Sequence, residues 1–140
     1  MSKKIIIIGS RRRDSEEDFQ LVFDTFNEHY EDGDKIISGG CPKGGDRFAE
    51  VIASRMGLTE DNGGLIIHRP IKPCQFTNTG LPKWAYAKTF YERNTVVAKE
   101  TEADSVVIAC VATDRTGGTE DTIRKVKRHN KMDLRNLKLV

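Results

Sequence analysis

The sequence predicts an α/β fold in which short buried strands alternate with amphipathic helices to form one doubly wound domain. Two apolar runs, Ile5 to Ile8 and Ser105 to Val111, are too short for helices and are typical of strands covered on both faces of a parallel sheet. The segments between them carry apolar residues at helical spacing. With 140 residues, the chain can bury one sizeable core but not two. We therefore expect a single domain over residues 1–140.

The first half of the chain predicts three strands and two helices. The strand of Ile5 to Ile8 ends at Gly9, and a helix over about 15–30 follows, because Ser15 and Asp18 have the spacing of a capping box. The elements that come next are a strand from Lys35 to Ser38, a helix from Gly45 to Met56 that Gly57 ends, and a strand from Leu65 to His68.

The second half begins with a long irregular segment from Arg69 to Pro82, and such a loop in a compact domain is often functional. It is followed by a helix over Lys83 to Glu102, the strand of Ser105 to Val111, a helix from Thr119 to Asn130 and an edge strand from Leu137 to Val140. This alternation predicts a five-stranded, mainly parallel sheet with right-handed crossovers and helices on both faces.

The composition argues against several classes of function. The 23 Lys and Arg residues nearly balance the 21 Asp and Glu residues, so we expect no clustered basic face for nucleic acid. Cys41, Cys74 and Cys110 are odd in number and lack the paired spacing of a zinc site, which favours reduced thiols and a cytoplasmic protein. The histidines show no ligand spacing either, so we expect no metal. The run from Ile5 to Ile8 is too short for a signal peptide or a membrane span.

Glycine-rich segments lie where predicted strands end and helices begin, and they indicate an anion site. In a parallel sheet, loops at the carboxyl ends of the strands converge on one crevice, where helix N-termini favour phosphate. The second loop supplies Ser38, Gly39, Gly40, Lys43, Gly44, Gly45 and Asp46. The fourth loop supplies Gly117, Gly118 and Thr119, of which Thr119 is a candidate N-cap and phosphate donor.

The first loop and the third helix add further candidates. Gly9, Ser10 and Arg11 end the first strand, where Ser10 can donate a hydrogen bond to phosphate and Arg11 can bind it with two. We expect the next two residues, Arg12 and Arg13, to be exposed. Arg93 and Asn94 lie within the third helix, where Arg93 is either solvated or a second clamp for a phosphate or carboxylate.

Two acidic residues have competing interpretations. Asp46 either caps the second helix or accepts hydrogen bonds from ribose hydroxyls. Glu50 lies one turn later and lines the same crevice if Asp46 does; otherwise it is an exposed surface residue. Cys41 stands beside the glycine loop, but no histidine is placed by the sequence to activate it, which favours a structural role.

Taken together, these residues resemble the SLOG superfamily, whose YspA-related branch consists of short single-domain proteins. The resemblance covers nearly the whole chain and is carried by Gly9-Ser10-Arg11, Ser38-Gly39-Gly40, Gly44 to Glu50, Arg93-Asn94, Asp104 before an apolar strand, and Gly118 to Ile123. It implies a Rossmann-like sheet that binds nucleotides or nucleotide-derived signals and requires no further cofactor. The superfamily also includes the DNA-processing Smf/DprA proteins and the Lonely Guy phosphoribohydrolases, which release a base from a nucleoside monophosphate.

The chain departs from the family pattern in two loops. Cys41-Pro42-Lys43 makes one loop a residue longer than the usual Ser-Gly-Gly-x-x-Gly-x-Asp, and Lys43 is a candidate direct ligand there. The phosphoribohydrolase motif resembles Pro-Gly-Gly-x-Gly-Thr-x-Glu-Glu, whereas this chain has Thr116-Gly117-Gly118-Thr119-Glu120-Asp121. The carboxylate that assists cleavage then maps to Glu120 or Asp121, or is absent.

Two functions follow as hypotheses. The first is a binding module or sensor for a nucleotide-type ligand, with Ser10, Arg11, Gly39, Gly40, Arg93 and Thr119 on phosphate and Asp46 or Glu50 on ribose. The second is a hydrolase of an N-glycosidic bond, in which Arg93 orients the phosphate and an acidic residue, with Glu50, Glu120 and Asp121 as candidates, stabilises an oxocarbenium-like centre. Binding of single-stranded nucleic acid is not favoured, because the aromatic and basic groove that it needs is missing.

The third helix also predicts self-association. It carries Trp84, Tyr86, Phe90 and Tyr91 beside the proline-rich segment, which is more aromatic surface than one small sheet can readily cover. Exposed aromatic patches commonly mark isologous interfaces, so we expect a homodimer or a higher homo-oligomer.

Overall fold

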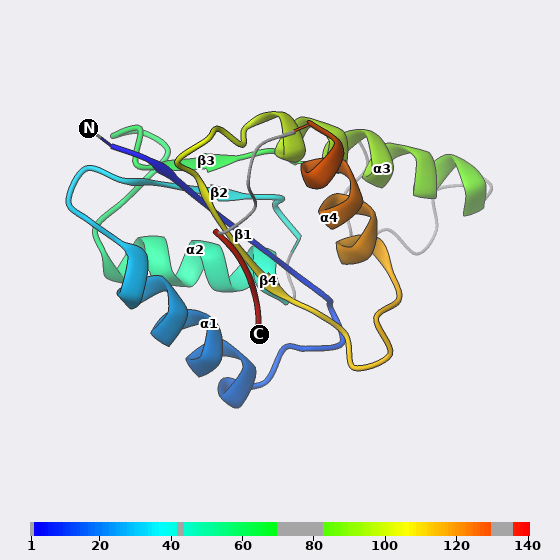
Figure 1. The fold of residues 1–140 in the computed structure, drawn as a ribbon, viewed down its shortest axis with the longest axis horizontal. Helices are drawn as coiled ribbons and strands as arrows, with labels where there is room; N and C mark the ends of the chain where they lie inside the picture. The colour runs from blue at the N-terminus through cyan, green and yellow to red at the C-terminus, as the bar shows by residue number, and fades with distance from the viewer. Residues whose placement is uncertain (1, 42–43, 70–82, 130–135) are drawn as a thin grey trace.

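The computed structural model confirms the doubly wound α/β fold; it describes residues 2–41, 44–69, 83–129 and 136–140, with the backbone alone for 83–90. The strands are β1 (Lys4–Gly9), β2 (Lys35–Ser38), β3 (Leu65–Ile67), β4 (Val106–Cys110) and β5 (Leu137–Leu139). The helices are α1 (Glu16–His29), α2 (Gly45–Arg55), α3 (Lys83–Lys99) and α4 (Gly118–His129) (Figure 1). Within the described ranges, no helix has the length and apolar character that crossing a bilayer requires.

The sheet has the strand order β3-β2-β1-β4-β5, and each of its pairings is parallel. β1 lies at the centre, where Ile5 pairs with Ile36 of β2 on one side and with Val106 of β4 on the other. The chain builds outward from β1 through β2 and β3, then returns to place β4 and β5 on the opposite side. This reversal leaves a crevice beyond the carboxyl ends of β1 and β4, which is the usual ligand position in such sheets.

Two hydrophobic cores lie on opposite faces of the sheet because the isoleucines of β1 alternate in direction. Ile5 and Ile7 pack in one cluster with residues of α1 and α2, among them Phe26 and Phe48. Ile6 and Ile8 pack in the other with residues of α3 and α4, among them Val97 and Ile123. The helices therefore cover both faces, α1 and α2 on one side and α3 and α4 on the other (Figure 1).

Local sequence signals explain how the first two helices begin. The expected capping box of α1 is present, because the Ser15 hydroxyl accepts from the backbone N–H of Asp18 and the Asp18 carboxylate accepts from that of Ser15. α2 starts at Gly45, packed so tightly against the end of β1 that a Cβ there would clash with the backbone of Ile8 and Gly9. Gly45 thus serves close packing of a helix on a strand.

Arg13, which was expected to be exposed, is half-buried and ties three elements together. Its Nη1 donates to the carbonyl oxygens of Val111 (2.9 Å) and Val140 (2.6 Å), and its Nε donates to Asp18 Oδ1 (2.9 Å). These contacts join the end of β4, the residue after β5 and the first turn of α1. Arg13 is therefore a structural residue of the sheet edge.

Candidate ligand-binding site

A cavity of about 350 Å³ lies at the crevice predicted from the strand order. The loop after β1, the middle of α3 and the start of α4 contribute to its wall. Of the residues predicted to bind a ligand, the lining includes Gly9, Ser10, Arg11, Gly39, Asp46, Arg93, Asn94, Gly117, Gly118 and Thr119. Segments that are far apart in the sequence therefore meet where the sequence analysis placed one site.

Four other candidates of the second loop do not line this cavity, namely Ser38, Gly40, Gly44 and Gly45. Ser38 is buried; its hydroxyl donates to the carbonyl oxygen of Asp46 (3.1 Å) and accepts from the N–H of Gly40 (3.1 Å). The N–H of Gly44 donates to Asp14 Oδ1 (2.8 Å), and Gly45 packs against β1. Lys43 lies outside the described residues. Ser38 and Gly40 thus take part in local hydrogen bonds of the loop and the start of α2, whereas Gly44 is hydrogen-bonded to the segment between β1 and α1.

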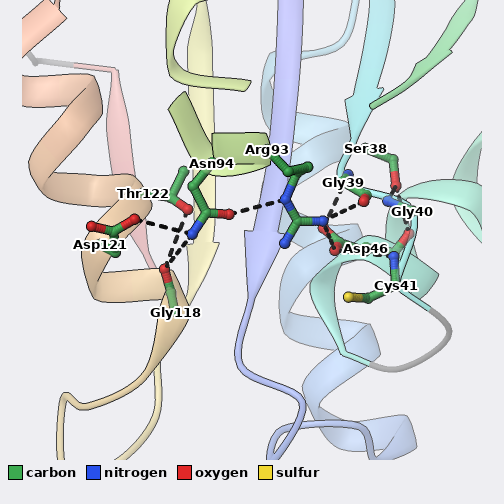
Figure 2. A network of polar contacts seen from close by, with 10 residues as sticks. All are labelled: Ser38, Gly39, Gly40, Cys41, Asp46, Arg93, Asn94, Gly118, Asp121 and Thr122. Atoms are coloured by element: carbon green, nitrogen blue, oxygen red, sulfur yellow. Dashed lines mark hydrogen bonds and ion pairs between the residues drawn. The ribbon is translucent and has the colours of Figure 1, made fainter. Parts of the chain in front are cut away.

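An ion pair between Arg93 and Asp46 lies at the centre of the site (Figure 2). Arg93 Nη1 lies 3.3 Å from Asp46 Oδ2 and also donates to the carbonyl oxygen of Gly39. The two side chains are only 11% and 9% exposed. The guanidinium reaches this position because residue 39 is glycine, since a Cβ there would clash with the Arg93 side chain. The hypothesis that Arg93 is merely solvated is therefore wrong.

Asp46 shapes the second loop instead of capping its helix. Its carboxylate accepts hydrogen bonds from the backbone N–H groups of Gly39 (3.1 Å) and Cys41 (3.2 Å). The N-cap of α2 is Gly44, with no side-chain hydrogen bond, so the capping interpretation of Asp46 is wrong. The carboxylate occupies N–H groups of the glycine loop that were expected to face a phosphate.

Burial and neighbouring charges act in opposite directions on this pair. Burial raises the pKa of the Asp46 carboxyl, whereas the charges of Arg93 and Arg11 and the N–H groups of Cys41 and Gly39 lower it. Burial likewise lowers the pKa of Arg93, and Asp46 opposes that shift. Each charge therefore offsets part of the cost of burying the other inside the domain.

Asn94 extends the network from Arg93 to the start of α4. Its Oδ1 accepts from Arg93 Nε (3.0 Å), and its Nδ2 donates to the carbonyl oxygen of Gly118 (3.3 Å) and to Asp121 Oδ2 (3.2 Å). The side chain is buried, and both ends of its amide are engaged. These contacts give Asn94 a positioning role, because it links the Arg93 side chain to the first turns of α4 (Figure 2).

Arg12 lies in the cavity lining and binds the loop between β4 and α4. As expected, its side chain is exposed. Its guanidinium makes two hydrogen bonds to Asp114 (2.9 and 3.0 Å) and two to Thr116 (both 2.8 Å). Hydrogen bonds from Arg12 and Thr116 lower the pKa of the Asp114 carboxyl to about 2. Arg12 thus connects the loop after β1 to the loop that precedes α4.

The three acidic residues considered for glycosidic cleavage lie outside the cavity lining. Glu120 is held by Arg115 through two contacts of 2.9 Å. Asp121 accepts from Asn94 and pairs with Lys125 at 2.9 Å. Glu50 is half-buried, and burial raises the pKa of its carboxyl. Among the described residues, the carboxylate that does line the cavity is that of Asp46.

Sequence reasoning missed several lining residues, namely Ile8, Arg12, Cys41, Tyr91, Val97 and Thr122. Ile8 was assigned to a buried strand, and Tyr91 to a self-interface. Thr122 could have been found from its spacing, because it lies one helical turn after Gly118 and donates to the carbonyl oxygen of that residue (3.3 Å).

One of the two described cysteines differs from the expectation of reduced thiols. Cys41 is disulfide-bonded, so the expectation is wrong for this residue, and the cysteine argument for a cytoplasmic protein loses its support there. Cys110 is free and buried, and burial raises the pKa of its thiol to about 11. Cys74 lies outside the described residues.

No known family model, curated protein or solved structure matches this chain. A function for this chain is therefore inferred from the cavity, its charges and the sequence motifs.

Proposed function

We propose that the protein binds or senses a small phosphate-bearing molecule, a nucleotide or a nucleotide-derived signal, in the cavity between β1, α3 and α4. The observation that carries this proposal is the convergence of Arg11, Arg93 and the N-terminus of α4 on one cavity. Guanidinium groups bind phosphate through charge-assisted hydrogen bonds, and a helix N-terminus offers N–H groups and partial positive charge. The SLOG-like motifs favour the same ligand class.

The size of the cavity favours a mononucleotide. Its volume of about 350 Å³ lies at the lower end of the range of roughly 300–1,000 Å³ that is typical of small-molecule sites. A dinucleotide needs a longer crevice, such as the one that spans both halves of larger doubly wound domains.

The start of α4 suits a phosphate better than the second loop does. In the second loop, Asp46 already accepts hydrogen bonds from Gly39 and Cys41. At α4, Gly117 and Gly118 are exposed in the cavity wall, and a Cβ at Gly118 would come no nearer than 3.9 Å to Asn94 Nδ2. An anion can therefore approach this helix end closely.

Hydrolysis of an N-glycosidic bond is the alternative, and the geometry favours it less. It needs a carboxylate close to the anomeric carbon. The candidates Glu50, Glu120 and Asp121 lie outside the lining, and Asp46 is already engaged by Arg93 and two backbone N–H groups. Release of free base from nucleoside monophosphates, followed by chromatography, separates the two functions.

The proposal is tested by calorimetric titration with AMP, GMP, CMP and UMP. We expect at least one of them to bind, and Arg11→Ala to weaken that binding by about 1.5–3 kcal/mol, roughly tenfold to a hundredfold, through loss of a charge-assisted hydrogen bond. Arg11 is exposed, so the variant should fold normally by circular dichroism. Arg128→Ala, an exposed arginine of α4 outside the lining, is the matched control. Absence of binding by all four nucleotides, or equal affinity of the Arg11→Ala variant, would overturn the proposal.

A further inference from the structure

Tyr91 gives the cavity an aromatic wall that the phosphate site does not use. It lies on α3 two residues before Arg93, lines the cavity and is 48% exposed. An aromatic side chain in a concave site offers a large flat apolar surface to a ligand. Because the side chain is half-exposed, a ligand group can cover its apolar surface.

The ring is held in place from α4. Lys125 Nζ lies over it, 5.5 Å from the ring centroid, and donates to the carbonyl oxygen of Tyr91 (2.7 Å). The same ammonium pairs with Asp121 (2.9 Å), which accepts from Asn94 in the network around Arg93. Because the Lys125 ammonium lies over one face of the ring, a ligand would stack on the other face.

The cavity lining thus combines apolar and cationic side chains. The apolar ones include Tyr91, Ile8 and Val97, whereas Arg11, Arg93 and the start of α4 provide positive charge. A sugar phosphate matches only the positive charge, but a molecule that joins an anion to a planar ring through a sugar matches both. We propose that Tyr91 is the stacking platform for an aromatic base, so that the site selects intact nucleoside monophosphates over sugar phosphates.

This inference rests on the proposed function and is tested by the difference in affinity between two types of ligand, a sugar phosphate and nucleotides. Wild-type protein is titrated with ribose 5-phosphate and with AMP, GMP, CMP and UMP. We expect the preferred nucleotide to bind roughly tenfold to a hundredfold more tightly than ribose 5-phosphate, which is the effect of stacking one base on an aromatic side chain. Tyr91→Leu should reduce nucleotide affinity to the level of ribose 5-phosphate and leave ribose 5-phosphate binding unchanged. Tyr91→Phe should keep the difference.

Val96→Ala is the matched control, because Val96 is an exposed residue of the same helix outside the cavity lining. Equal binding of ribose 5-phosphate and the nucleotides by the wild type would overturn the stacking platform and leave phosphate binding intact. Equal weakening of both ligand types in Tyr91→Leu would also overturn it, since the residue would then only position the site. If neither ribose 5-phosphate nor any nucleotide binds, the proposed function itself fails.

Discussion

At the scale of single residues, the site depends on two charges that are buried against each other. Arg93 and Asp46 come from α3 and α2, and both side chains are largely buried although they line the cavity. Removal of one partner from such a pair leaves an uncompensated charge in the interior, which costs far more than the pair itself contributes. A substitution in this pair is therefore expected to change both the shape of the cavity and the stability of the domain.

We predict that Arg93→Met lowers the free energy of unfolding by about 3–5 kcal/mol, because it leaves the Asp46 carboxylate buried without its cation. The double variant Arg93→Met/Asp46→Asn should lose less, since a neutral amide is cheaper to bury and its oxygen still accepts from a backbone N–H of the loop. Urea denaturation of the single and double variants measures the difference. Equal losses would show that the two charges are not coupled.

The same variant has a defined pH dependence. Burial already raises the pKa of Asp46, and the loss of Arg93 removes the largest influence that lowers it. A carboxyl whose pKa is higher in the folded state than in the unfolded state contributes stability below the unfolded pKa, about 3.9 for Asp, and loses it as the pH rises through the folded pKa. The deficit of Arg93→Met relative to wild type should therefore shrink as the pH is lowered from neutral toward that value. A deficit that is constant with pH would contradict this assignment.

At the scale of elements, the loop between β4 and α4 depends on a contact from the far end of the sequence. Arg12, in the loop after β1, binds Asp114 and Thr116 just before the glycines that begin α4. This contact sets how the loop enters the cavity wall, and Asp114 reports on it directly.

We predict that Arg12→Gln raises the pKa of Asp114 from about 2 toward the ordinary value of about 3.9, because the guanidinium that stabilises the carboxylate is lost. The two hydrogen bonds from Thr116 should keep the pKa somewhat below that value. Titration of the side-chain carboxyl by NMR measures the shift. Asp18, which pairs with Arg13 instead, is the internal control and should titrate as in the wild type. An unchanged Asp114 would exclude the contact in solution.

The elements themselves could be predicted because their signals are local. Runs of β-branched residues such as Ile5 to Ile8 mark strands, and Ser15 with Asp18 marks a helix start. The partners of Asp46 could not be predicted, since Arg93 reaches it only through tertiary packing of α3. The place of Tyr91 in the cavity lining could not be predicted for a similar reason: the rotation of α3 about its axis, which decides what enters the cavity, is not fixed by aromatic spacing.

At the scale of the whole molecule, self-association stays a prediction. The side chains of Trp84, Tyr86 and Phe90 lie outside the described residues, and Tyr91 lines the cavity. The aromatic content of this helix still favours an interface between copies of the chain. We expect light scattering at tens of micromolar, roughly the range where a weak contact already shows, to give at least twice the mass of one chain. A monomeric mass would refute the interface.

The central position of β1 has a consequence for the chain while it is being synthesised. β1 is synthesised before its second partner, which lies far along the chain, because Ile5 pairs with Val106. Contacts of such high sequence separation form slowly, and native pairing has to wait until β4 has been synthesised. Until then the nascent chain carries an open parallel edge, and Ile6 and Ile8 lack the helices that later cover them. Stalled or truncated chains that end before β4 are therefore the forms that most need a chaperone and are most prone to aggregate.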